Sequence, residues 1–126
     1  VNIASMAGKV GTAKSTGYTA SKHAMIGFTN SLRQELRGSG IIVSAVNPGP
    51  IRTPFFDRAD PGGQYLNSMP SWFVLSPDEV AQAVLRTIVK KKRELTIPGI
   101  GGFAIKLSQL FPRLFDKLAG GMINKK

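Results

Sequence analysis

Three short runs of apolar and β-branched residues alternate with stretches of helical periodicity, and this alternation limits the folds open to the chain. The runs occupy residues 1–5, 41–46 and 94–98. From about Tyr18 to Arg37, apolar residues recur at three- and four-residue spacing, which predicts an amphipathic helix. A strand, a helix and a further strand favour parallel pairing, so the sequence predicts an α/β fold with a parallel sheet. The apolar positions of the helix are Ala20, Ala24, Met25, Phe28, Leu32 and Leu36.

Turn residues set the expected limits of the first helix and the second strand. Gly38 and Gly40 are expected to end the helix, and residues 47–50, Asn-Pro-Gly-Pro, to stop the strand. Residues 51–75 are then broken repeatedly by proline and glycine. Loops of that length inside compact domains are typically functional lids or disordered.

A second helix is expected from Ser76 to about Lys92. Ser76 suits the N-cap, Pro77 suits the first helical position, and Glu79 has the spacing of a capping box. The glycine-rich residues 99–102 are expected to form a turn after the third strand.

We divide the chain into residues 1–102, which would form half of a domain, and residues 103–126, a basic amphipathic helix interrupted at Pro112. Such a helix can lie on an anionic membrane surface, dock on its own domain or form a subunit contact. Its apolar residues are Phe103, Leu107, Leu110, Phe111, Leu114, Phe115, Leu118 and Met122, and its basic residues are Lys106, Arg113, Lys117 and Lys125.

The composition excludes several classes of protein. The 126 residues make one domain at most, and a hydrophobic content of 42% is enough for a core. The absence of cysteine excludes disulfides and thiolate metal ligands, so we expect no metal site, and it fits a cytoplasmic protein. Residues 1–5 resemble the end of a buried strand, with no signal peptide or initiator methionine, so we expect a fragment.

The net charge of +10 includes a basic run at residues 90–93. Nucleic acid or an anionic membrane would suit this charge, and a solvated lysine-rich surface is the simpler explanation. The basic residues are not interleaved with aromatic residues in a recognisable motif, so we expect no nucleic-acid partner.

Tyr18 and Lys22 are the most informative polar pair. They are four residues apart near the start of a helix, so the phenol and the ammonium share one face. The ammonium favours the ionised phenol, and the positive end of the helix dipole acts in the same direction. Such a phenol can exchange a proton with a carbonyl or hydroxyl group during a reaction.

Two further segments are expected at the same edge of the sheet. Ser5 ends the first strand, while Pro48, Gly49 and Thr53 follow the second. Ligands of open α/β sheets bind outside the carboxyl ends of the strands, so these residues should meet Tyr18 there. The Ser5 hydroxyl can hydrogen-bond a carbonyl oxygen, and Gly49 allows the backbone to approach a ligand closely.

The joint spacing of these residues resembles the short-chain dehydrogenase/reductase family. That family has a serine thirteen residues before a Tyr-x-x-x-Lys motif, then Pro-Gly and a threonine a few residues later, as at Ser5, Tyr18, Lys22, residues 48–49 and Thr53 here. The match covers most of residues 1–98. It implies the C-terminal half of a Rossmann-like, doubly wound parallel sheet.

The resemblance implies an oxidoreductase that transfers a hydride between NAD or NADP and a small-molecule carbonyl/alcohol substrate. Tyr18 would be the general acid/base. Lys22 would bind the nicotinamide ribose and favour the ionised tyrosine, and Ser5 would polarise the substrate carbonyl.

The remaining site residues would hold the cofactor. By the resemblance, Pro48, Gly49 and the backbone of Ile51 bind the carboxamide side of the nicotinamide, and Thr53 contacts the cofactor. The helix from Tyr18 is the family's usual dimer element, which implies a homo-oligomer.

Simpler roles remain open for several residues. Ser5 could hydrogen-bond its own backbone, and Thr53 could cap a short helix. His23 could be a surface or interface residue, and Arg52 an exposed loop residue. Six large side chains in residues 55–73 could line a pocket for a hydrophobic ketone or acyl substrate, or could simply pack the loop down: Phe55, Phe56, Tyr65, Met69, Trp72 and Phe73.

The family's glycine-rich phosphate-binding turn and its Asn-Asn-Ala-Gly motif do not occur in this sequence. We therefore expect the 126 residues alone to bind dinucleotide weakly and to be inactive. A catalytically silent dinucleotide-binding protein and a peripheral membrane protein are the alternatives to an enzyme.

Overall fold

The chain folds around a three-stranded parallel sheet in the computed structural model, which describes residues 1–115 and 117. The strands are β1 (Asn2–Ile3), β2 (Ala45–Pro48) and β3 (Glu94–Ile97), and β2 lies between the other two. In the register, Ala45 pairs with Asn2 of β1 and with Glu94 of β3. The α/β class and the parallel sheet predicted from the sequence are confirmed.

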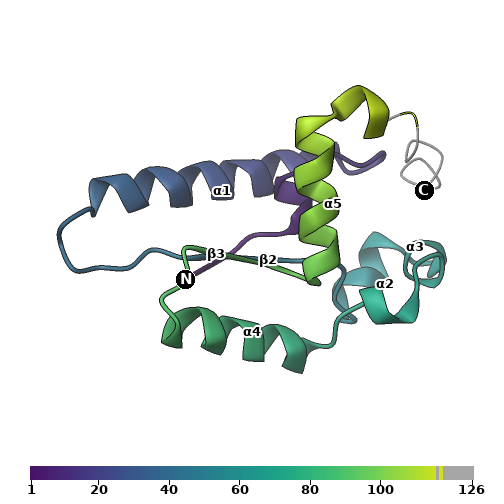
Figure 1. Cartoon of the computed structure of the whole chain (residues 1–126). Coiled ribbons are helices and arrows are strands. Elements are labelled where there is room, and N and C mark those ends of the chain that lie inside the picture. Colours follow the sequence, from purple (N-terminus) through teal and green to yellow (C-terminus); the bar gives the residue numbers. More distant parts are fainter. Residues whose placement is uncertain (116, 118–126) are drawn as a thin grey trace.

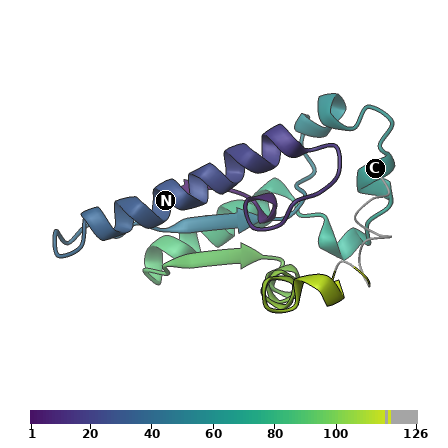
Figure 2. The ribbon, with the colours of Figure 1, turned by 90° about the horizontal axis from the view of Figure 1, so that it is seen from above.

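Helices cover both sides of the strands. The helix α1 (Thr16–Glu35) connects β1 to β2 on one side, and α4 (Pro77–Val89) precedes β3 on the other (Figure 1). After β3, α5 (Gly99–Leu110) starts at the carboxyl end of that strand, and Figure 2 shows it nearly end-on. No helix within the described residues is long and apolar enough to cross a bilayer.

Four short helical segments lie around the carboxyl ends of the strands. The 3₁₀ turn η1 (Met6–Gly8) follows β1. The long stretch after β2 is not a plain loop, because it contains α2 (Phe55–Ala59), α3 (Gln64–Asn67) and the 3₁₀ turn η2 (Ser71–Phe73). In Figure 1, α2 and α3 lie together beyond one end of the sheet.

The second strand begins and ends later than residues 41–46, where the β-branched run predicts it. The Asn2 N–H donates to the Ser44 carbonyl at 2.9 Å, and the Ala45 N–H donates to the Arg93 carbonyl at 3.2 Å. Among the described residues, the ladder therefore starts where β1 and β3 begin, and Ile41 stays exposed before it. The Asn-Pro pair belongs to β2, and the strand stops at Gly49.

The side of α1 that faces the sheet also differs from the predicted apolar stripe. Ala20, Ala24 and Phe28 are exposed, whereas Met25, Leu32 and Leu36 of the same predicted stripe are half-buried. The contacts are made instead by Lys22, Ile26, Thr29 and Arg33, which share one helical face. Thr29 is 1% exposed and its hydroxyl accepts from Asn2 Nδ2 at 2.9 Å, while Arg33 Nε donates to the Val43 carbonyl at 2.9 Å. Polar groups therefore hold α1 on the sheet.

The helix limits follow the predicted signals with small shifts. α1 begins two residues before Tyr18 and ends at Glu35, and Gly38 and Gly40 then adopt φ of 86° and 84°, which favours glycine. The capping box of α4 is confirmed, since Ser76 and Glu79 each accept a backbone N–H of the other.

Two helix ends depart from the predictions. α4 ends at Val89 rather than near Lys92, because Lys91 takes a left-handed conformation with φ of 49°. Residues 99–102 are not a turn but the first turn of α5, so this helix begins before Phe103. The glycines allow it to pack closely: a Cβ on Gly101 would lie 3.3 Å from a ring carbon of Phe73 and closer still to Met6.

The tail helix breaks at Phe111, one residue before the predicted interruption at Pro112, and residues 112–115 are helical again. The predicted positions Leu118, Met122 and Lys125 lie outside the described residues.

Candidate active site

A cavity of about 1000 Å³ lies at the carboxyl ends of β1 and β2. It is bounded by the segment after β1, the first turns of α1, the segment after β2 and the short helices α2 and α3. Every site residue predicted from the sequence lines this one cavity: Ser5, Tyr18, Lys22, Pro48, Gly49, Ile51 and Thr53.

Tyr18 and Lys22 meet on one face of α1, as their spacing predicts. Tyr18 is in the first turn and 41% exposed, and Lys22 Nζ lies 5.6 Å from the centre of its ring. The same ammonium approaches the carbonyl oxygen of Ile3 at 3.5 Å, at the end of β1. The ammonium is thus held between the phenol ring and the strand end.

Ser5 combines a backbone role with a place in the cavity wall. Its side chain is 9% exposed, and the hydroxyl caps η1 by accepting the Ala7 N–H at 3.1 Å. The hydroxyl proton points to the Pro48 carbonyl over a long 3.5 Å contact. Because that contact is weak, the hydroxyl can turn toward a better acceptor in the cavity.

The segment after β2 turns its backbone toward the cavity at Ile51. Ile51 forms a parallel bridge with Leu75 that uses the Pro50 carbonyl and the Arg52 N–H, at 2.8 and 2.9 Å. In a parallel bridge of this kind the central residue's own N–H and C=O point away from the partner. The Ile51 N–H is therefore directed away from Leu75.

Gly49 and Thr53 have contacts that the sequence did not predict. A Cβ on Gly49 would lie 3.2 Å from Met6 Sδ and 3.4 Å from Pro98 Cδ, so the glycine serves packing as well as access to the cavity. Thr53 does not cap α2, whose N-cap is Pro54 without a side-chain bond. Its hydroxyl donates to the Ile51 carbonyl at 3.4 Å.

A polar network beneath the site was missed by sequence reasoning. Glu94 forms an ion pair with Lys9 and accepts from Asn47 Nδ2 at 2.5 Å. Asn47 is fully buried, and its Oδ1 has no hydrogen-bond partner among the described residues. The network joins the end of η1, near Ser5, to β2 and β3. Asn47 next to Pro-Gly was visible in the sequence, but its partners are far away in the chain.

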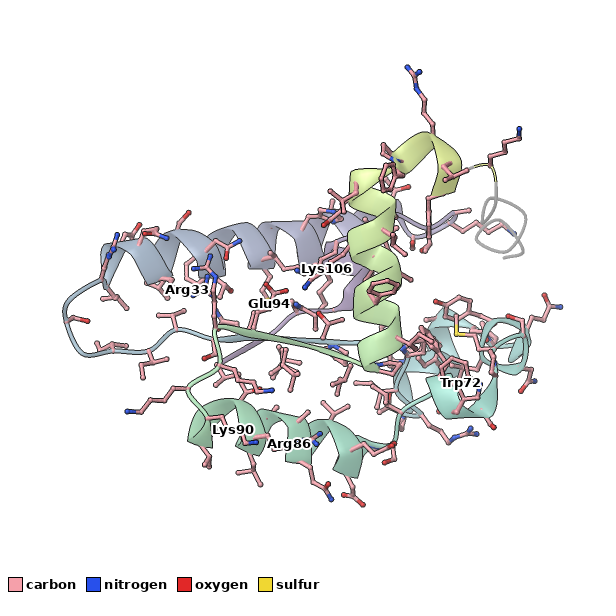
Figure 3. The ribbon with its side chains drawn as sticks, in the orientation of Figure 1. Arg33, Trp72, Arg86, Lys90, Glu94 and Lys106 are labelled. Atoms are coloured by element: carbon pink, nitrogen blue, oxygen red, sulfur yellow. The ribbon has the colours of Figure 1, made fainter. Side chains whose placement is uncertain are left out.

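A second polar contact near Glu94 joins α1 to β3. Figure 3 shows Arg33 extending from α1 toward the start of β3. Its Nη2 donates to the Arg93 carbonyl at 3.1 Å. Burial, and then the charge of Arg93, lower the pKa of Arg33 from its usual value, while Glu94 opposes this change.

An aromatic row lines the cavity next to the tyrosine. Tyr18 and Phe55 have ring centres 5.8 Å apart, Phe55 and Phe56 are 5.2 Å apart, and Phe56 stacks on Tyr65 at 6.0 Å. Phe73 also lines the cavity. Met69 and Trp72, the other two residues considered for the pocket, are not among its lining residues.

Tyr65 remains a neutral phenol in this row. Burial raises its pKa above the usual 10.0, and Tyr18 and Asp60 raise it further. The two neighbouring tyrosines thus differ: Tyr65 is half-buried, whereas Tyr18 is exposed and lies beside an ammonium.

The two residues judged peripheral are exposed. His23 lies on the surface of α1 with Nδ1 2.9 Å from the Thr19 carbonyl, and Arg52 is an exposed residue of the segment after β2. The arrangement around the cavity can therefore hydrogen-bond oxygen atoms through hydroxyl groups and an ammonium, next to an aromatic wall.

The chain is similar to known proteins in sequence and in fold. The family model described as short chain dehydrogenase matches residues 1–62. Dehydrogenase/reductase SDR family member 7B of Xenopus laevis is 34% identical to the chain, over 100% of the chain and 40% of its own length.

Two solved structures have a fold similar to that of this chain. An F189W actinorhodin polyketide ketoreductase with NADPH has a TM-score of 0.63 and 31% identity, over 76% of this chain and 44% of that one. A short chain dehydrogenase from Burkholderia cenocepacia J2315 in complex with NADP has a TM-score of 0.72, over 98% of this chain and 47% of that one; its 24% identity makes it a match in fold alone.

A parallel sheet between helices, with a cavity at its carboxyl edge that is lined by both polar and aromatic side chains, defines a Rossmann-like α/β protein. The chain belongs to the short-chain dehydrogenase/reductase family of oxidoreductases. It spans less than half the length of the relative and structures compared above.

Proposed function

We propose that the protein containing this chain transfers a hydride between NAD or NADP and a carbonyl/alcohol pair. The observation that carries the proposal is the meeting of Ser5, Tyr18, Lys22 and the segment after β2 around one cavity. Two related structures were determined with NADP or NADPH, which supports the choice of cofactor class.

The residues around the cavity fit the nicotinamide half of such a cofactor. The Lys22 ammonium supplies donors for ribose hydroxyls, and the Ile51 N–H, directed away from Leu75, supplies a donor for the carboxamide. The Thr53 hydroxyl lines the same wall. When bound, the dinucleotide supplies or accepts the hydride, while the protein positions groups and manages the proton.

Tyr18 is the proton donor for carbonyl reduction in this proposal. As the hydride reaches the carbonyl carbon, the phenol gives its proton to the oxygen, and an alcohol results. The Lys22 ammonium, 5.6 Å from the ring centre, stabilises the phenolate left behind. Ser5 donates a hydrogen bond to the same oxygen as negative charge develops there. Alcohol oxidation runs through the same groups in reverse.

The aromatic row suggests a hydrophobic substrate. Phe55 lies directly against the ring of Tyr18, so a substituent on the reacting carbonyl would meet Phe55 first and Phe56 and Tyr65 beyond it. Apolar and aromatic surface buried there would contribute to binding.

Replacing Tyr18 with phenylalanine in the whole protein tests the proposal. We expect the turnover rate to fall by roughly 10²- to 10⁴-fold, the usual contribution of a general acid/base, with nucleotide affinity retained. Tyr65→Phe removes a hydroxyl from the same cavity and should cost far less. An unchanged turnover rate for Tyr18→Phe would show that the phenol is not the acid/base and would favour a silent binding protein.

We also infer a homo-oligomer that uses the outer face of α1. Phe28 is 60% exposed there and lies beside the small residue Ala24, which leaves a flat apolar surface. Phe28→Glu should shift the whole protein toward monomer in light scattering, whereas Asn30→Glu on the same helix should not. An unchanged oligomer would exclude this face.

A further inference from the structure

The outer side of α5 carries an unpartnered apolar stripe. We define it as Ile100, Phe103, Leu107 and Leu110, which are 59%, 64%, 40% and 71% exposed. Their spacing of three, four and three residues places them on one face of the helix. A row of exposed large side chains along one helix face is uncommon on a soluble surface and marks a site of interaction.

The stripe is not the face by which α5 docks on its own domain. That role belongs to Gly101 and Ile105, which are buried on the other side. Gly101 packs against Met6 and Phe73. The helix is therefore already attached to the domain by one face, and the stripe is a second apolar face.

Trp72 is also exposed, but it is connected to α5 through Phe73 on the docked face and is not part of the stripe. Its ring lies 5.7 Å from the ring of Phe73, the residue that packs on Gly101, and it is 61% exposed.

The charge around the stripe is mainly positive. In Figure 3, Lys106 leaves α5 on the side that faces Glu94, and Arg113 and Lys117 follow in the next turns. Residues 95–126 contain five basic residues and one acidic residue, Asp116. A second copy of the chain would bring the same cations to the contact, and like charges oppose such pairing. An anionic lipid surface offers apolar depth and negative charge together.

We propose that the apolar stripe of α5 lies in the surface of a bilayer that contains anionic lipids. The stripe inserts at the boundary between headgroups and acyl chains, and Lys106 and Arg113 contact the headgroups. Lys106 is exposed, and its long stem can lie along apolar surface while the ammonium reaches the headgroups from the flank of the helix. The inference is independent of the proposed reaction, because none of these residues lines the catalytic cavity.

Vesicle flotation of the whole protein tests this surface. Vesicles of phosphatidylcholine alone are compared with an equal mixture of phosphatidylcholine and phosphatidylserine. We expect binding to the mixed vesicles that weakens as salt rises from about 0.1 M to about 1 M, where the screening length falls from roughly 10 Å to 3 Å. Lys106→Gln and Arg113→Gln should each weaken binding about fivefold, the effect of one cation near an anionic surface.

Matched variants test whether the loss of vesicle binding depends on where the replaced residue lies rather than on the type of residue. Leu110→Gln should weaken vesicle binding by at least about tenfold, whereas Ile41→Gln, at a site 62% exposed but away from α5, should not. Lys91→Gln removes the same charge as Lys106→Gln from the end of α4 and should have a smaller effect.

Three results would overturn the proposal. The first is equal binding to neutral and anionic vesicles, or none to either. The second is a change of oligomeric state in Leu110→Gln with vesicle binding unchanged, which would assign the stripe to a second copy. The third is a lower unfolding temperature in Leu110→Gln with no vesicle binding by the parent protein, which would assign the stripe to another part of the same protein.

Discussion

Replacing Gly8 with alanine should separate the two segments that carry the proposed proton-handling residues. Gly8 closes η1, three residues after Ser5, and faces the backbone carbonyl group of Lys22 in α1. A Cβ added at this position would lie 2.7 Å from the Lys22 carbonyl oxygen and 2.6 Å from Ile26 Cδ1. Both distances are too short for carbon, so something must move.

The cost follows from what can move. Ile26 Cδ1 is the end of a flexible side chain and can rotate away, but the Lys22 carbonyl belongs to the backbone of α1. Restoring an ordinary contact of about 3.4 Å requires η1 and α1 to part by more than half an ångström. Over-packing of this kind costs about 1–3 kcal/mol of unfolding free energy. Since misplacement by about 1 Å can cost 10²-fold in rate, we expect turnover to fall roughly ten- to hundredfold.

Gly27→Ala is the matched control for Gly8→Ala. Gly27 lies in the middle of α1, and a Cβ there meets nothing within 4 Å. Alanine should stabilise the helix by about 0.5–1 kcal/mol and leave turnover unchanged. Urea unfolding and steady-state turnover of the whole protein measure both effects. If Gly8→Ala is as stable and as active as the parent, or if both variants behave alike, the close packing of η1 on α1 does not position the site.

Two further predictions concern groups outside the catalytic set. Glu94→Leu leaves the buried amide of Asn47 without its acceptor and should cost about 1–3 kcal/mol in urea unfolding, whereas Glu94→Gln keeps an acceptor and should cost less. Hydrogen bonding from the Ser76 backbone lowers the pKa of Glu79. The ionised Glu79 carboxylate therefore stabilises the folded state fully above the ordinary carboxyl pKa of 4.5, and this stabilisation is lost as the pH falls through the lowered pKa of the folded state. The difference in unfolding temperature between parent and Glu79→Gln should therefore narrow from about pH 5 to about pH 3; a constant difference would exclude the capping carboxylate as its source.

The fold class and the members of the site could be predicted from the sequence because both depend on local order along the chain. A strand end, a helix start and a second strand end are recognisable from a few residues each. Parallel pairing then brings Ser5, Tyr18 and Pro48 to one edge, and the structure places them around one cavity. Their chemical roles stay predictions, and Tyr18→Phe tests the central one.

The limits of β2 could not be predicted because register depends on partner strands. Residues 41–43 have strong β preference, but β1 and β3 both begin opposite Ala45. The glycines at 99–102 were similarly misleading. Glycine usually marks a turn, yet here Gly101 allows a helix to pack against Met6 and Phe73 at a distance that no larger residue permits.

The face of α1 that contacts the sheet was also hard to predict, because its partners are distant in the chain. Lys22 belongs to this face and also to the proposed site. Hydropathy favours the exposed Phe28 as a sheet contact, but the strand ends offer carbonyl oxygens, and Lys22 and Arg33 satisfy them. Lys22 thus packs its backbone on Gly8, anchors its ammonium at the Ile3 carbonyl and holds the same charge beside the ring of Tyr18. Because one residue makes all three contacts, the docking of α1 on the sheet also fixes the position of the Tyr18 phenol, to which the proposed function assigns the proton transfer.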